Sequence, residues 1–80
     1  FNLHMINEDP KAIAEFVIYN SDAEFGIYSF YTNVTGPVPH LGWLEQTVDV
    51  GYWYYATSLG LPPYSAGESP PSNRIFSPPP

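Results

Sequence analysis

The feature that most constrains the fold is a short internal repeat. Residues 15–19 read Glu-Phe-Val-Ile-Tyr, and residues 24–28 read Glu-Phe-Gly-Ile-Tyr. The residues between them, Asn-Ser-Asp-Ala, have the composition of a turn. Folded as a hairpin around that turn, the repeat places Phe16 opposite Ile27 and Ile18 opposite Phe25, all on one face. The repeat therefore predicts an antiparallel hairpin with one apolar, covered face.

A helix is the competing interpretation for residues 10–20. Asp9 would be its N-cap and Pro10 its first residue, with a buried stripe that includes Phe16. The β-branched and aromatic run at residues 16–19 favours the strand. Helix and strand also compete over residues 43–59, where the Val, Tyr and Trp content favours a strand at 47–57.

The predicted fold class is therefore mainly β. We expect a small antiparallel sheet built on a 15–32 hairpin, with at most one short helix. Residues 26–34 are expected to continue the second strand, and the Gly-Pro-Val-Pro stretch at 36–39 to break it.

Proline divides the chain into two parts, because most of its ten prolines lie within residues 62–80. Proline has no amide hydrogen to donate to a β-ladder and favours the extended polyproline conformation. The sequence thus predicts a small β-rich domain over residues 1–61 and an extended, proline-rich C-terminal arm over residues 62–80.

Charge and motif content exclude several classes of protein. Two cationic side chains against eight carboxylates give a net charge of −6, which does not suit binding to nucleic acid phosphates. No apolar run approaches the roughly 20 residues that span a bilayer. Nucleophile-elbow, P-loop and dinucleotide motifs are absent, and His4 and His40 show no metal-ligand spacing. We therefore expect no catalytic residue, no metal site and no cofactor.

Aromatic residues make up 18% of the chain and charged residues only 12%. A two-layer domain of this size covers one face of its sheet, so some aromatic surface should remain uncovered. Uncovered apolar surface on a folded chain usually marks an interface, and Tyr and Trp are enriched there. The expected interface residues are Tyr28, Phe30, Trp43, Trp53 and Tyr55, with Pro62, Pro63 and Tyr64 in the arm.

These features indicate a non-enzymatic structural or interaction subunit of a larger assembly, whose partners are other protein subunits. An extracellular filament, a coat or an accessory position on a complex would suit it. The low Lys and Arg content, with abundant Tyr, Pro, Ser and Thr, favours an extracytoplasmic or secreted location. Asn33-Val34-Thr35 matches the N-glycosylation pattern.

Two alternatives remain open. Trp53 and Tyr55 share one side of the 47–57 strand, so the chain would bind carbohydrate if those rings formed a platform. The chain begins at Phe1 and not at Met, so it is also read as a fragment of a proteolytically processed larger enzyme.

Overall fold

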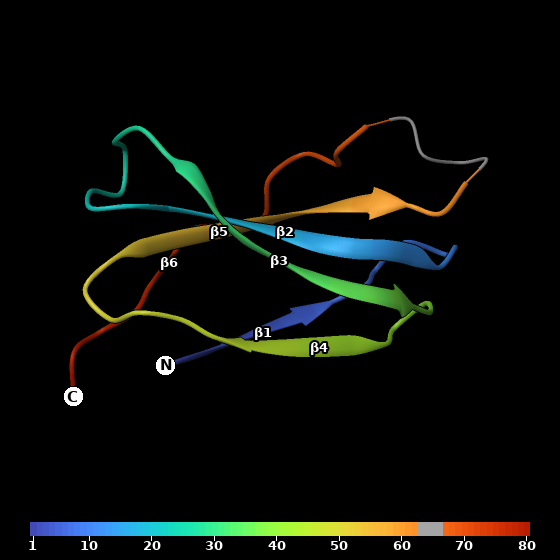
Figure 1. Cartoon of the computed structure of the whole chain (residues 1–80), viewed down its shortest axis with the longest axis horizontal. Coiled ribbons are helices and arrows are strands. Elements are labelled where there is room, and N and C mark those ends of the chain that lie inside the picture. Colours follow the sequence, from blue (N-terminus) through green and yellow to red (C-terminus); the bar gives the residue numbers. More distant parts are fainter. Residues whose placement is uncertain (63–66) are drawn as a thin grey trace.

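The computed structural model describes residues 1–62 and 67–80, which form strands in two antiparallel sheets and contain no helix. The mainly β prediction is confirmed. Strands β1 and β4 form the smaller sheet, and the larger sheet has the order β3-β2-β5-β6. The strands are β1 (Asn2–Ile6), β2 (Ile13–Ser21), β3 (Ser29–Val38), β4 (Trp43–Thr47), β5 (Trp53–Gly60) and β6 (Ile75–Phe76). Figure 1 shows the β1–β4 pair below the larger sheet. Across the described residues, no helix is long and apolar enough to cross a bilayer.

The hydrophobic core lies between the two sheets. Along β1, Leu3 and Met5 are buried while Asn2, His4 and Ile6 are exposed, as the alternation of side chains in a strand requires. Their counterparts on the larger sheet include Ile18 and Tyr54, which are 0% and 1% exposed. The core therefore covers one face of the larger sheet. The buried apolar cluster comprises Leu3, Met5, Ile13, Phe16, Ile18, Val38, Val48 and Tyr54.

The hairpin forms, but the predicted register is wrong. Strand β2 pairs with β3, so Ile18 faces Thr32 and not Phe25. The second copy of the repeat, residues 24–28, lies entirely in the loop between the strands. Gly26 explains this, because its N–H donates to the Ala23 carbonyl at 3.1 Å, and a Cβ there would lie 2.8 Å from the Ser21 hydroxyl oxygen. The tight turn contains the residues that the repeat predicted as the second strand.

The helical alternatives for residues 10–20 and 43–59 are also wrong, because both regions are built from strands. The single strand predicted at 47–57 is instead divided between β4 and β5, which belong to different sheets. Gly51 lies between them with φ +85°, a conformation that suits glycine. The predicted break at residues 36–39 comes later than expected, since β3 continues through Gly36 and Pro37 to Val38. Proline is tolerated there because β3 is an edge strand.

The described part of the C-terminal segment lies along the free side of β5 in its own chain. Strand β6 pairs antiparallel with β5, and three serines extend this pairing beyond the two residues of β6. Each serine makes two hydrogen bonds to one partner residue on the side of β5. The serine N–H donates to the carbonyl of that residue, and the serine hydroxyl accepts its N–H. The prolines between the serines have no N–H to donate. The pairs are Ser69 with Ser58, Ser72 with Ala56 and Ser77 with Tyr52.

Candidate interaction surface

The outer face of the larger sheet, opposite the core, carries a group of touching aromatic rings. Tyr19 of β2 stacks on Tyr55 of β5, with ring centroids 5.1 Å apart. Tyr28 lies against the same Tyr55 at 4.8 Å, and Phe30 of β3 meets Tyr19 edge-on at 6.4 Å. We call these four residues the aromatic face. Three neighbouring strands or their flanks contribute to it, so its geometry is fixed by the ladder register.

Hydrogen bonds within the chain hold two of the tyrosine hydroxyls of this face, those of Tyr19 and Tyr28. The Tyr19 hydroxyl donates to the Glu68 carboxylate, whose oxygens lie 2.6 and 2.7 Å away. This hydrogen bond and partial desolvation raise the pKa of Tyr19 above its usual value. The Tyr28 hydroxyl donates to the Glu24 carbonyl at 2.8 Å, and desolvation raises its pKa. Both phenols therefore stay neutral at physiological pH, and their rings are held in place.

The C-terminal segment supplies further side chains beside the aromatic face. The Arg74 guanidinium lies 5.7 Å from the Tyr28 ring centroid and 5.3 Å from that of Phe25, within the range of cation–π contact. Phe76 of β6 packs against Trp53 of β5 at 5.3 Å. The loop between β2 and β3 is thus linked to the C-terminal segment across the sheet.

Exposure differs sharply over this region. Phe30 is 61% exposed, and Phe25 and Ile27 in the adjoining loop are 81% and 94% exposed. Trp53 and Tyr55, in contrast, are half-buried and packed against neighbouring rings. A sugar platform needs an open ring face, so this packing does not favour the carbohydrate interpretation. The open apolar surface lies at Phe30 and the loop.

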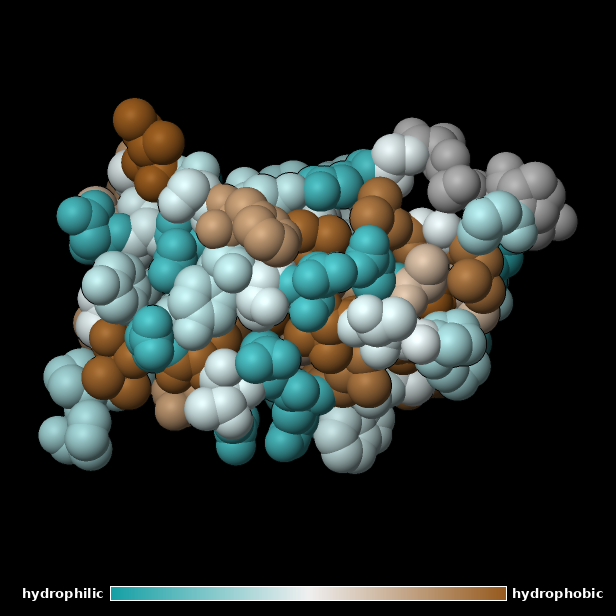
Figure 2. All heavy atoms as spheres, in the orientation of Figure 1, coloured by the Kyte–Doolittle hydropathy of each residue, from teal (hydrophilic) through white to brown (hydrophobic). Residues whose placement is uncertain are grey.

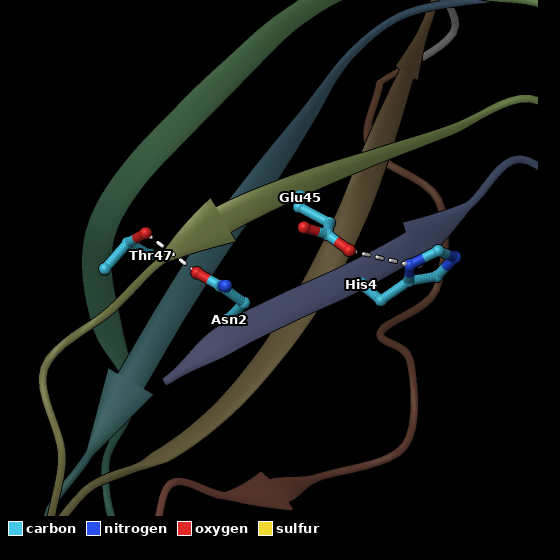
Figure 3. Close-up of polar contacts among 4 residues, drawn as sticks. All are labelled: Asn2, His4, Glu45 and Thr47. Atoms are coloured by element: carbon cyan, nitrogen blue, oxygen red, sulfur yellow. Dashed lines mark hydrogen bonds and ion pairs between the residues drawn. The ribbon is translucent and has the colours of Figure 1, made fainter.

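Trp43 does not join the other predicted interface residues. It lies on the outward face of β4 in the smaller sheet, 56% exposed, and stacks on His4 with ring centroids 4.7 Å apart. Beside it, His4 Nδ1 lies 3.5 Å from Glu45 Oε1, and the Thr47 hydroxyl donates to Asn2 at 2.8 Å (Figure 3). This second cluster is separate from the aromatic face and more polar.

The structure thus gathers Tyr28, Phe30, Trp53 and Tyr55 on the outer side of the larger sheet. Pro62 is exposed, whereas Pro63 and Tyr64 lie outside the described residues. Sequence reasoning assigned Phe25 and Ile27 to the covered face and missed both as surface residues. The signal that could have revealed them is Gly26, which separates them and allows a turn.

Asn33 is exposed on edge strand β3, and its side-chain amide donates to Glu15 Oε2 at 2.6 Å. Its glycosylation stays a prediction. In residues 1–62 and 67–80, no group of three or more His, Cys, Asp or Glu side chains is placed to hold a metal ion. Comparison with protein-family models, curated protein sequences and solved structures finds no match for this chain.

Proposed function

We propose that this chain is a non-enzymatic structural or interaction subunit of a larger assembly, which docks through the aromatic face. The supporting observation is the open apolar surface at one end of the outer side of the larger sheet and in the adjoining β2–β3 loop, where Phe30, Phe25 and Ile27 are each more than half exposed. Exposed apolar residues gathered at one place mark contact surfaces more often than scattered ones do. The partners would be other protein subunits, in an extracytoplasmic setting that the composition favours.

The arrangement of the rings suits docking for an energetic reason. Binding costs free energy when mobile side chains become fixed. Here the hydroxyls of Tyr19 and Tyr28 are already bonded within the chain, and the rings already pack on each other. A partner would therefore immobilise few additional rotamers, and the half-buried rings would support the exposed Phe30 at the centre of a contact.

In this proposal the C-terminal segment acts as part of the sheet and not as a free arm. Because its serines pair with β5, it would dock as the outermost strand of the sheet. Its contribution to the contact would be Arg74 and Phe76, which lie beside the aromatic face.

The test is concentration-dependent self-association, measured by sedimentation velocity. Phe30→Ser should weaken association by about tenfold, the usual effect of truncating a central apolar anchor. Ile6→Ser is the matched control, because Ile6 is 48% exposed but lies on the smaller sheet. Equal weakening by both variants would contradict docking through the aromatic face, and a chain that stays monomeric would contradict assembly from copies of itself.

A further inference from the structure

We propose that Tyr19 and Tyr55 form an oxidative cross-linking site, where a one-electron oxidant of the peroxidase class joins the two rings by a carbon–carbon bond. The product is a dityrosine within one chain, which links β2 to β5. The inference concerns the single chain, so it does not depend on the proposed assembly function. Three features distinguish this pair from the other tyrosines, namely ring contact, a carboxylate beside one hydroxyl, and exposure to solvent.

The larger sheet holds the two rings together. Tyr19 and Tyr55 are direct partners in the pairing of β2 with β5. Side chains that face each other across an antiparallel pair have Cβ atoms about 5 Å apart. The ring centroids are 5.1 Å apart and the ring planes differ by 28°, so the rings are stacked. The ring carbons next to each hydroxyl, where an oxidised phenol reacts, are therefore within reach of each other.

The carboxylate of Glu68 supplies the proton acceptor that this oxidation needs. Loss of an electron turns a phenol into a strong acid, so the electron leaves readily only when the proton can leave with it. The Tyr19 hydroxyl donates to Glu68, whose two oxygens lie 2.6 and 2.7 Å away. The same hydrogen bond raises the pKa of Tyr19, so the phenol keeps its proton until it is oxidised. Tyr19 is therefore the ring that loses the first electron.

Tyr28 also lies against Tyr55, at 4.8 Å, but its surroundings oppose oxidation. Its hydroxyl donates to the Glu24 backbone carbonyl, which is too weak a base to take the proton. The Arg74 guanidinium lies 5.7 Å from the Tyr28 ring centroid, and a nearby positive charge makes the removal of an electron more costly. Tyr55 should therefore couple to Tyr19 and not to Tyr28.

Exposure separates the chosen pair from the tyrosines of the core. Tyr54, which meets Tyr31 edge-on, is 1% exposed and donates its hydroxyl to a backbone carbonyl. Tyr19 and Tyr55 are only half-buried. Figure 2 shows apolar atoms of the β2–β3 loop standing clear of the body of the molecule, in agreement with the high exposure of its apolar side chains. This loop therefore leaves the outer rings accessible to a small oxidant.

The reaction needs no group other than the oxidant. The oxidant takes one electron from Tyr19 as its proton passes to Glu68, and one electron from Tyr55 as its proton passes to water. The two radicals join through the carbons next to their oxygens. The hydrogen on each of these carbons then moves to the oxygen and restores the phenol, and Glu68 releases its proton to water. Two electrons and two protons have left the chain, and with a peroxidase one hydrogen peroxide takes them up and becomes two waters.

The experiment is oxidation of the whole chain at low concentration by hexachloroiridate(IV). This small one-electron oxidant is too weak to oxidise a phenol that keeps its proton, and physiological ionic strength screens its repulsion from the acidic chain. The monomer should lose the mass of two hydrogen atoms and gain the fluorescence of dityrosine.

Cleavage after glutamate locates the bond. It places Tyr19 in fragment 16–24, Tyr55 in fragment 46–68, and both Tyr28 and Tyr31 in fragment 25–45. The expected product is fragment 16–24 joined to fragment 46–68. Tandem mass spectrometry of this product should place the bond at Tyr55.

Three variants test the roles of the residues. Tyr55→Phe should abolish the product while it leaves the bond between Tyr19 and Glu68 in place. Glu68→Gln still offers a hydrogen-bonding side chain but cannot take a proton, so it should slow formation by about tenfold or more. Tyr52→Phe is the matched control, because Tyr52 is 39% exposed but lies outside the aromatic face, and it should leave the yield unchanged.

Four results would overturn the inference. These are a chain that forms no cross-link, a product that joins fragment 25–45 to fragment 46–68, formation at the wild-type rate in Glu68→Gln, and an equal loss of product in Tyr52→Phe. Cross-links found only between chains would also refute a bond within one chain, and would leave the proposed assembly function standing. Failure to self-associate in sedimentation would contradict assembly from copies of the chain and leave this cross-link unaffected.

Discussion

Replacing Ser77 with alanine should destabilise the chain more than its position near the C-terminus suggests. Ser77 is 0% exposed, and its hydroxyl donates to the Asp49 carbonyl at 2.8 Å. The same oxygen accepts the Tyr52 N–H at 3.3 Å. The backbone bonds from Ser77 N–H to Tyr52 and from Gly51 to the Ser77 carbonyl do not depend on the side chain. The substitution therefore isolates the contribution of the hydroxyl.

The expected cost follows from the number of bonds and from their burial. Each net hydrogen bond contributes about 1 kcal/mol, and the Ser77 hydroxyl makes two of them at a part-buried position. Ser77→Ala should thus lower the free energy of unfolding by about 2 kcal/mol. In a domain of this size, that loss lowers the midpoint of thermal unfolding by about 10 °C.

Ser72→Ala is the matched control. Ser72 also accepts a β5 N–H, that of Ala56 at 2.9 Å, but Ser72 is exposed, so water can replace its hydroxyl. Its loss should cost at most about 0.5 kcal/mol. Urea unfolding of both variants measures the difference, with an unchanged denaturant slope showing that the native fold is retained. Equal costs for the two variants would refute the argument that burial of the Ser77 hydroxyl decides its contribution.

Four further outcomes are expected. Leu41 has φ 63° and is 63% exposed, so Leu41→Gly should stabilise the chain by up to about 1 kcal/mol in thermal unfolding; a loss of stability would show that its side chain packs. Gly51→Ala should cost about 1 kcal/mol, because a Cβ there has no atom within 4 Å to meet and only the φ of +85° opposes it. Burial raises the pKa of Tyr54 from 10.0 to about 12, so the phenol ionises at lower pH in the unfolded chain than in the folded one. The contribution of this burial to the free energy of unfolding is complete below pH 10.0 and should be lost as the pH rises to about 12. Tyrosinate absorbance measures the ionisation, and unfolding at several pH values measures the loss of stability. Intact mass of the chain isolated from its source should exceed the bare-sequence mass if Asn33 is glycosylated, and equality would remove that prediction.

The strands could be predicted where the evidence was local. The β-branched and aromatic run at residues 16–19 indicated a strand, and Phe16 and Ile18, on its predicted covered face, are both buried. The register could not be predicted, because the repeat suggested a partner close in sequence. The partners that actually face these residues, Val34 and Thr32, follow a turn that Gly26 makes possible.

The exposed aromatic surface could also be predicted only in part. An excess of aromatic residues over available interior predicted uncovered rings, and Phe30 is one of them. Which rings lie together depends on sheet membership, which a single sequence does not encode locally. Trp43 and Trp53 lie ten positions apart, yet β4 and β5 belong to different sheets, so the two rings are on separate surfaces.

The serine pairs along β5 also determine how the chain would respond to mechanical force. Ser69, Ser72 and Ser77 are discrete attachment points, and the two residues of β6 pair with β5 between Ser72 and Ser77. A sideways pull on the C-terminus would load Ser77 first, and then Ser72 and Ser69 in turn. Under tension the C-terminal segment should therefore detach from β5 in steps. A partner bound to this end of the chain could then remove the outer strand while the central strands stay folded.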